Sequence, residues 1–206
     1  MSPAPKWTRK GASNTIRSRN VEGTMKPAIM LFCLLPVFNV SAQTCREVVR
    51  DSSGRIVQTI ERRTNSDGTV HSVIRNAAGR IEGTSVTRPD GGGGSRTDYR
   101  DASGRHSGSA TTRSSRSGFS NTSYRDAQGR SSGSAVTQTN GNQSRTQFRN
   151  ASGRSSGSVT TSGYASGTTS SVRRDASGRL SGSSTASGAC RGNVATPPVH
   201  ANGLTR

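Results

Sequence analysis

The stretch that decides the fold is Arg100-Asp101-Ala102-Ser103-Gly104-Arg105, because close variants of it occur six times in the chain. All six have the form Arg-(Asp/Asn)-x-x-Gly-Arg, and successive copies begin 25, 25, 25, 24 and 25 residues apart. A fixed period of this length is typical of a protein built from repeated supersecondary units. The copies span residues 50–55, 75–80, 100–105, 125–130, 149–154 and 174–179.

Each copy has the residue types of a tight β-hairpin turn. The Asp or Asn side chain at the second position accepts a hydrogen bond from a backbone N–H two residues on, and the Gly supplies a positive φ. This combination predicts a type I turn closed by a glycine bulge. The residue before each copy is apolar in five cases and Arg173 in the sixth. The five apolar residues are Val49, Ile74, Tyr99, Tyr124 and Phe148.

A second turn signal lies about midway between successive copies. These signals are residues 65–68, 89–91, 117–118, 140–141 and 162–163, and each contains Gly. One repeat is therefore strand, tight turn, strand, looser turn, which gives about twelve strands of about 6–8 residues. We expect an all-β fold in which six β-hairpin repeats of about 25 residues form an antiparallel meander or shell. A stacked two-strand β-solenoid also fits the period.

Composition leaves a third reading open, because low hydrophobicity and high charge are typical of disorder. The chain is 27% hydrophobic and carries a formal net charge of +18. Globular domains are about 45–50% apolar. Regular repetition argues against disorder, because stacked repeats build structure without one large core.

The N-terminal part of the chain predicts export. From Met25 a single Lys precedes an apolar run of 14 residues, and small residues at 40–42 fit a cleavage site after Ala42. That run is shorter than the ~20 apolar residues of a membrane span. We therefore assign residues 1–24 to an over-extended, disordered start, 25–42 to a signal peptide, 43–188 to the repeat array and 189–206 to a C-terminal tail.

Residues 99–105 and 124–130 resemble the Tyr-Asp repeat of bacterial RHS/YD proteins, in which a Tyr-Asp-x-x-Gly-Arg-Leu core sits at hairpin turns of a β-sheet shell. The likeness runs over residues 46–188, although an Arg separates Tyr from Asp here and only Leu180 supplies the Leu. The resemblance implies a secreted β-repeat protein and brings no catalytic residue with it.

Two cysteines of the predicted mature chain, Cys45 and Cys190, bracket the array. An even pair in an oxidising compartment predicts a disulfide. Bridged Cα atoms lie within about 7 Å of each other, whereas six straight stacked coils separate the ends by nearly 30 Å at about 4.8 Å each. The bond is therefore internal if the array curves or the tail returns, and otherwise joins two molecules.

Arginines are the leading functional candidates. The predicted mature chain has 23 Arg, no Lys and ten acidic residues, a net charge of +13. In a meander the flanking arginines of the six turns meet at one sheet edge, where guanidinium groups suit phosphate or carboxylate. The alternative is that they only neutralise the turn and keep the edge soluble. The candidates are Arg50, Arg55, Arg75, Arg80, Arg100, Arg105, Arg125, Arg130, Arg149, Arg154, Arg174 and Arg179.

The motifs of enzymes and metal sites are missing from the sequence. The histidines His71, His106 and His200 fall at unrelated positions of the repeat, without a Cys or paired carboxylate at ligand spacing. The Gly run 91–94 lacks the helix and the Lys-Ser/Thr of a phosphate loop. We expect no catalytic residue, no cofactor, no metal and no small-molecule substrate.

The sequence thus predicts an exported, non-enzymatic repeat protein with a structural or binding role in the bacterial periplasm, at the cell surface or outside the cell. Anionic polysaccharide or lipopolysaccharide is the expected partner, with no membrane anchor after cleavage. One alternative is a self-assembling, amyloid-like fibre subunit, because the strands are rich in Ser, Gly and Thr and their layout resembles curli-type subunits. The other is a nucleic-acid-binding basic protein, which export and sparse aromatic residues disfavour.

Overall fold

The computed structural model describes residues 43–115 and 117–190, and the described part of the chain is entirely β-structure with turns. β1 begins at Gln43, the residue after the predicted cleavage position. The strands are β1 (Gln43–Asp51), β2 (Ile56–Thr64), β3 (Val70–Asn76), β4 (Ile81–Pro89), β5 (Ser95–Asp101), β6 (His106–Ser114), β7 (Phe119–Asp126), β8 (Ser131–Asn140), β9 (Gln143–Asn150), β10 (Ser155–Gly163), β11 (Thr169–Arg174) and β12 (Leu180–Gly188).

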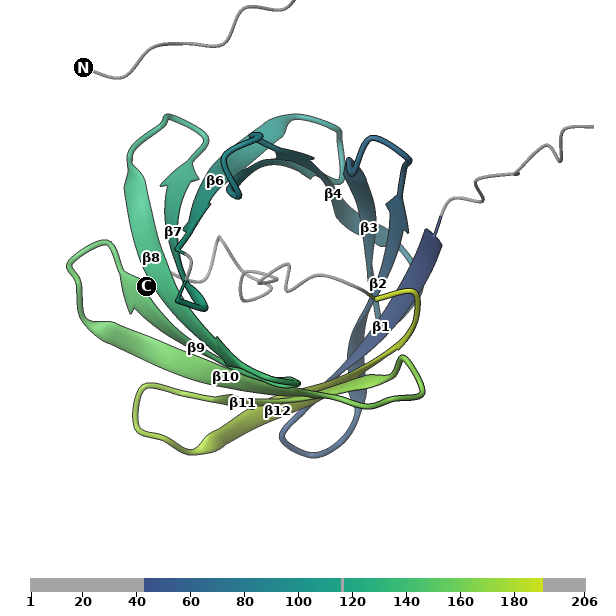
Figure 1. Ribbon diagram of the computed structural model, residues 1–206. Helices are drawn as coiled ribbons and strands as arrows, with labels where there is room; N and C mark the ends of the chain where they lie inside the picture. The colour runs from purple at the N-terminus through teal and green to yellow at the C-terminus, as the bar shows by residue number, and fades with distance from the viewer. Residues whose placement is uncertain (1–42, 116, 191–206) are drawn as a thin grey trace, which may run out of the picture. The chain divides into compact units, whose positions relative to one another are not determined.

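The strands form one antiparallel meander that closes into a barrel (Figure 1). Each strand pairs with the next along the chain, and β12 returns to pair with β1 in a register that sets Cys45 opposite Gly188 and Asp51 opposite Gly182. The expected all-β antiparallel meander is confirmed, and its closure is complete. The described residues form neither a stacked solenoid nor a disordered chain.

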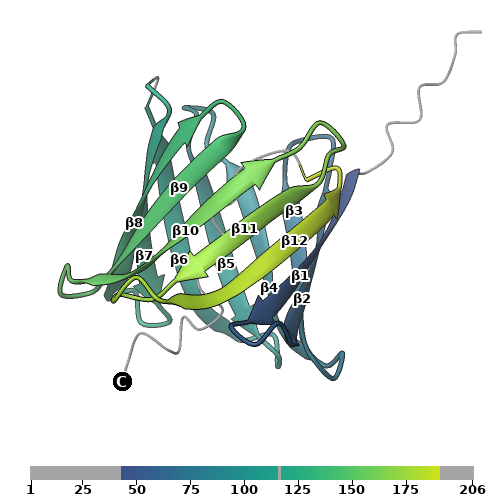
Figure 2. The same ribbon diagram turned by 90° about the horizontal axis from the view of Figure 1, so that it is seen from below.

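Hairpin turns alternate between the two ends of the barrel (Figure 2). Because the chain runs up and down, the six Arg-(Asp/Asn)-x-x-Gly-Arg turns all lie at one end. Every hairpin closed by such a turn also has a register shift beside the turn, as between Tyr99 and Arg100. The extra residue of such a bulge increases the local twist, and strand twist allows a sheet to curl on itself.

The strands are longer than the sequence suggested, since they run from six to ten residues. Strands that follow the arginine turns continue through Gly and Ser positions that are poor strand formers. One predicted turn is also misplaced. β10 includes Gly163, and the chain turns at residues 164–168, where Gly167 N donates to Tyr164 O. A Tyr-x-x-Gly sequence thus makes the turn that we assigned to residues 162–163.

Alternate residues of each strand face the barrel interior, and these are the buried ones. Most are small or hydroxylated, and hydroxyl pairs bond across neighbouring strands, as Thr87 does with Thr97 at 2.8 Å. Three further pairs repeat this contact around the wall. A small apolar cluster of Ala110, Tyr124, Ala135 and Phe148 lies on one side. Strand pairing and closure, with only a thin core, therefore hold this weakly hydrophobic chain together.

Candidate functional site

The arginine turns share one hydrogen-bond pattern, seen at Asp101. Its carboxylate Oδ1 accepts from the backbone N–H groups of Ser103 and Arg105, both at 2.9 Å. Gly104 N donates to Asp101 O at 3.0 Å, and the φ of Gly104 is +79°. All six turns have these contacts, with Asn in place of Asp at residues 76 and 150. The predicted acceptance of backbone N–H groups by the Asp or Asn side chain and the positive φ at Gly are both observed.

The first arginine of each turn, which we call the leading arginine, fixes the turn. Its Nη1 donates to the carbonyl oxygen of the turn Gly, at distances from 2.7 Å for Arg125 to 3.1 Å for Arg75. One guanidinium nitrogen of each leading arginine is thus occupied within its own turn. The leading arginines are Arg50, Arg75, Arg100, Arg125, Arg149 and Arg174.

The last arginine of each turn, the trailing arginine, is exposed in every copy. Arg55 forms an ion pair with Asp51, from Nε to Oδ2 at 2.9 Å, and its side chain is 81% exposed. The other five trailing side chains make no hydrogen bond or ion pair with any described residue. These five are Arg80, Arg105, Arg130, Arg154 and Arg179.

We call the twelve leading and trailing arginines together the arginine rim. With four aspartates among them, the six turns together carry a formal charge of +8. The carboxylates are already engaged by turn amides. At Asp51 desolvation acts to raise the pKa, but hydrogen bonds from Arg55 and Ser53 outweigh it and hold the pKa below its ordinary value. The rim is thus a ring of cations with few competing internal anions.

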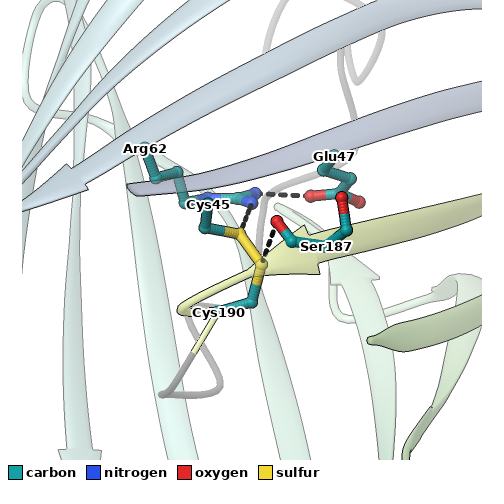
Figure 3. The surroundings of a disulfide bond; sticks show 5 residues. All are labelled: Cys45, Glu47, Arg62, Ser187 and Cys190. Carbon is teal, nitrogen blue, oxygen red and sulfur yellow. Dashed lines mark hydrogen bonds and ion pairs between the residues drawn. A yellow bond between two sulfur atoms is a disulfide. The ribbon is translucent and has the colours of Figure 1, made fainter. Parts of the chain in front are cut away.

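Cys45 and Cys190 form a disulfide at the junction of β1 and β12, with Cα atoms 4.9 Å apart (Figure 3). Barrel closure brings the two ends of the array together, so the bond is internal. Arg62 lies beside the bond, with Nη1 4.0 Å from Cys45 Sγ, and its Nη2 donates to Glu47 Oε2 at 2.6 Å. A disulfide points to an oxidising, extracytoplasmic compartment.

Other predicted features lie apart from the rim or outside the described residues. His71 and His106 are exposed, while His200 and the predicted signal peptide fall outside the described ranges. Within residues 43–115 and 117–190, no group of three His, Cys, Asp or Glu residues is placed to hold a metal ion. The same residues include no helix long and apolar enough to cross a membrane.

Sequence reasoning missed a group of charged side chains on the inner wall. Glu47 and Arg62 form an ion pair whose side chains are each 12% exposed, and Arg173 faces the same interior. Burial lowers the pKa of Arg173, and the charge of Glu47 opposes that shift. The sequence did contain a sign of Arg173, because it is the one non-apolar residue at the repeat position just before the arginine turn.

We compared the chain with known protein families and with curated proteins. No family model matches the chain, and no curated protein is similar to it.

Proposed function

We propose that the protein is an exported, non-enzymatic binding or structural protein of the bacterial periplasm or cell surface. Its arginine rim would hold an anionic polysaccharide or lipopolysaccharide. The observation that carries this proposal is the set of five exposed trailing arginines that lack an internal partner. A rim that served only to neutralise its own turns would pair Arg105, Arg130 and Arg179 with the Asp of their turns, as Arg55 pairs with Asp51.

The spacing of the rim suits a chain-like anion better than a small one. Neighbouring arginine turns are two strands apart, which is about 10 Å at about 4.8 Å per strand. Each trailing guanidinium offers donors that match a carboxylate, sulfate or phosphate oxygen pair. A flexible polyanion with regularly repeated acid groups would therefore touch several turns at once, and the affinity of the separate contacts would combine.

The export part of the proposal is supported by the disulfide and by the signal-peptide pattern at residues 25–42. We further propose that the six hairpins are copies of one unit of about 25 residues. Their relation to RHS/YD repeats, suggested by residues 99–105 and 124–130, belongs to the same proposal.

The test is binding to immobilised heparin and to lipopolysaccharide as a function of salt. We expect binding at low salt that weakens steeply as salt rises, because exposed charges are screened. The variant Arg105→Ser/Arg130→Ser removes two unpartnered trailing arginines and is expected to weaken binding by about fivefold to thirtyfold, since exposed ion pairs contribute about 0.5–1 kcal/mol each.

A matched control removes the same charge elsewhere. Arg113 and Arg145 are exposed near the opposite end of the barrel, so Arg113→Ser/Arg145→Ser alters net charge equally while leaving the rim intact. Equal weakening by both double variants would indicate a general charge effect and contradict a rim site. No binding at low salt would also contradict the proposal.

Two other functions are less well supported. A fibre would need open strand edges, and closure of β12 on β1 pairs the edges of this sheet. Nucleic acid would suit the charge, but Tyr99, Tyr124 and Phe148 belong to the inner cluster and not to the rim, where bases would stack. Tighter binding of single-stranded DNA than of heparin would favour the nucleic-acid function instead.

A further inference from the structure

The inward-facing positions of the barrel wall have similar residue types from one repeat to the next. Gln58 is one of four residues that depart from this pattern. Gln58 is the third residue after its turn, at an inward position where every other copy has Gly. Its side chain is 1% exposed, and Nε2 donates to Glu82 Oε2 at 3.0 Å, but Oε1 is buried with no partner. The matching glycines are Gly83, Gly108, Gly133, Gly157 and Gly182.

Arg173 is the second interruption. It occupies the inward position before the turn that is apolar in the other five copies, and its register partner on β12 is Gly182. The guanidinium is partly exposed and makes no hydrogen bond with the described residues. Glu47 acts on it only through its charge. Its five donor positions therefore make no hydrogen bond to the described residues.

Glu47 and Arg62 are the other two residues that depart from the repeat pattern. At their repeat positions, four other pairs of strands have hydroxyl residues that bond to each other, such as Thr112 of β6 with Thr122 of β7 at 2.9 Å. Glu47 and Arg62 instead form an ion pair of 2.6 Å across the junction of β1 and β2, which is closed by an arginine turn. Neutral hydroxyls thus close the wall elsewhere, and closure itself does not require charges.

The four interruptions lie on neighbouring strands. Arg173 is on β11, Glu47 on β1, and Gln58 and Arg62 on β2, with β12 between β11 and β1. The inward residues of β12 here are Gly182 and Ser184, which are small. All departures of this kind thus converge on the junction where the barrel closes, and we call the four residues the seam cluster.

Structural need does not explain the seam cluster. Burying charged side chains costs stability compared with the hydroxyl or apolar residues that other copies use. The junction of β1 and β12 already has a ladder of paired residues and a disulfide. A half-buried cation with no hydrogen bond to a described residue and a buried acceptor without a donor are features expected of a binding site.

We propose that the seam cluster binds a small hydroxylated carboxylate, the chemistry of a free sugar acid. Glu47 is paired with Arg62, and the Glu82 carboxylate accepts from Gln58, so Arg173 is the charged side chain of the seam cluster that has no hydrogen-bonded counter-ion, which favours an anion there. The planar guanidinium of Arg173 matches a carboxylate in bidentate fashion. Gln58 Oε1 accepts a hydrogen bond from a hydroxyl of the same ligand, and Ser184 adds another hydroxyl on the strand between. This site is separate from the arginine rim and does not rest on it.

The experiment is isothermal titration calorimetry of the purified protein with sodium glucuronate, methyl glucoside and inorganic phosphate. Glucuronate should bind, the neutral glucoside should not, and phosphate should bind about threefold to tenfold more weakly because it lacks the sugar hydroxyl that donates to Gln58. Equal binding of phosphate and glucuronate would overturn the assignment to a sugar acid.

The variants are taken from the repeat itself, so the backbone accepts them in other copies. Arg173→Val introduces the residue found at Val49 and is expected to weaken glucuronate binding about tenfold or more, and Gln58→Gly about threefold to tenfold. Circular dichroism should show unchanged strand content in both. If Arg173→Val fails to fold, Gln58→Gly alone decides the outcome.

Arg113→Ser/Arg145→Ser is the matched control and should leave glucuronate binding unchanged. No heat of binding for glucuronate, or equal affinity of the native protein and both seam variants, would overturn the site. A loss of glucuronate binding in Arg105→Ser/Arg130→Ser would assign the ligand to the rim, and would equally overturn the seam site.

Discussion

At the scale of single residues, the turn carboxamides and carboxylates are equivalent. Asn76 and Asn150 accept the same two backbone N–H groups as the four aspartates, at 3.0 Å in each case. The function of this position is therefore to accept hydrogen bonds, and negative charge is secondary. The leading arginine adds a contact to the turn Gly that the sequence did not reveal.

We expect Asp101→Ala to destabilise the barrel by about 1 kcal/mol, because two turn amides lose their acceptor. Asp101→Asn is the control and should stay within about 0.5 kcal/mol of the native protein. Chemical denaturation followed by circular dichroism measures both. Equal destabilisation by Asn and Ala would show that charge, and not acceptance, matters at this position.

At the scale of strands, the inward glycines set how closely neighbouring strands approach. A Cβ at Gly108 would lie 2.5 Å from the carbonyl oxygen of Arg125, and the φ of Gly108 is +151°. Both the contact and the backbone conformation exclude larger residues. At Gly108 the absence of a side chain is therefore a packing requirement of the wall.

Gly108→Ala should therefore destabilise the protein by about 1–3 kcal/mol through crowding and backbone strain. The matched control is Gly92→Ala, since a Cβ at Gly92 meets nothing closer than 3.8 Å. Thermal unfolding of the two variants should differ clearly in midpoint. A midpoint for Gly108→Ala equal to that of the control would show that the neighbouring strands accommodate a Cβ at residue 108 without loss of stability.

Local elements were predicted correctly where a residue type determines the backbone conformation by itself. The Asp-x-x-Gly turns were correct because Asx acceptance and a positive φ are local properties. The turn at residues 164–168 was missed because Tyr164 gives no turn signal, and strand lengths were underestimated because Gly and Ser have low strand propensity. The seam cluster was missed because the sequence does not show which face of each strand becomes the interior of the barrel. That face is defined only when the sheet curves and closes.

At the scale of the whole molecule, closure is the decisive property. The sequence favoured a meander but left its curvature open, because twist accumulates over all strand pairs and no single residue encodes it. The positions of Cys45 and Cys190 were informative in retrospect, since an internal bond already required the ends to meet.

Removal of the disulfide should lower stability by about 2–5 kcal/mol, because it closes a long loop in the unfolded chain. The sequence separation of the cysteines is 145. Denaturation of residues 43–206 with and without reductant, beside Cys45→Ser/Cys190→Ser, measures the effect. Reductant should lower the denaturation midpoint of the native protein and leave that of the double variant unchanged. A native protein insensitive to reductant would contradict this role.

The disulfide also makes the barrel a covalent ring, because loops join eleven strand pairs and sulfur joins the twelfth. Any one cut in a loop therefore opens the ring without releasing a fragment. A protease that nicks the exposed glycines at residues 91–93 would leave a species of undiminished mass, which separates into two pieces only after reduction. For a protein exposed to extracellular proteases, such a ring confers tolerance of single cleavages.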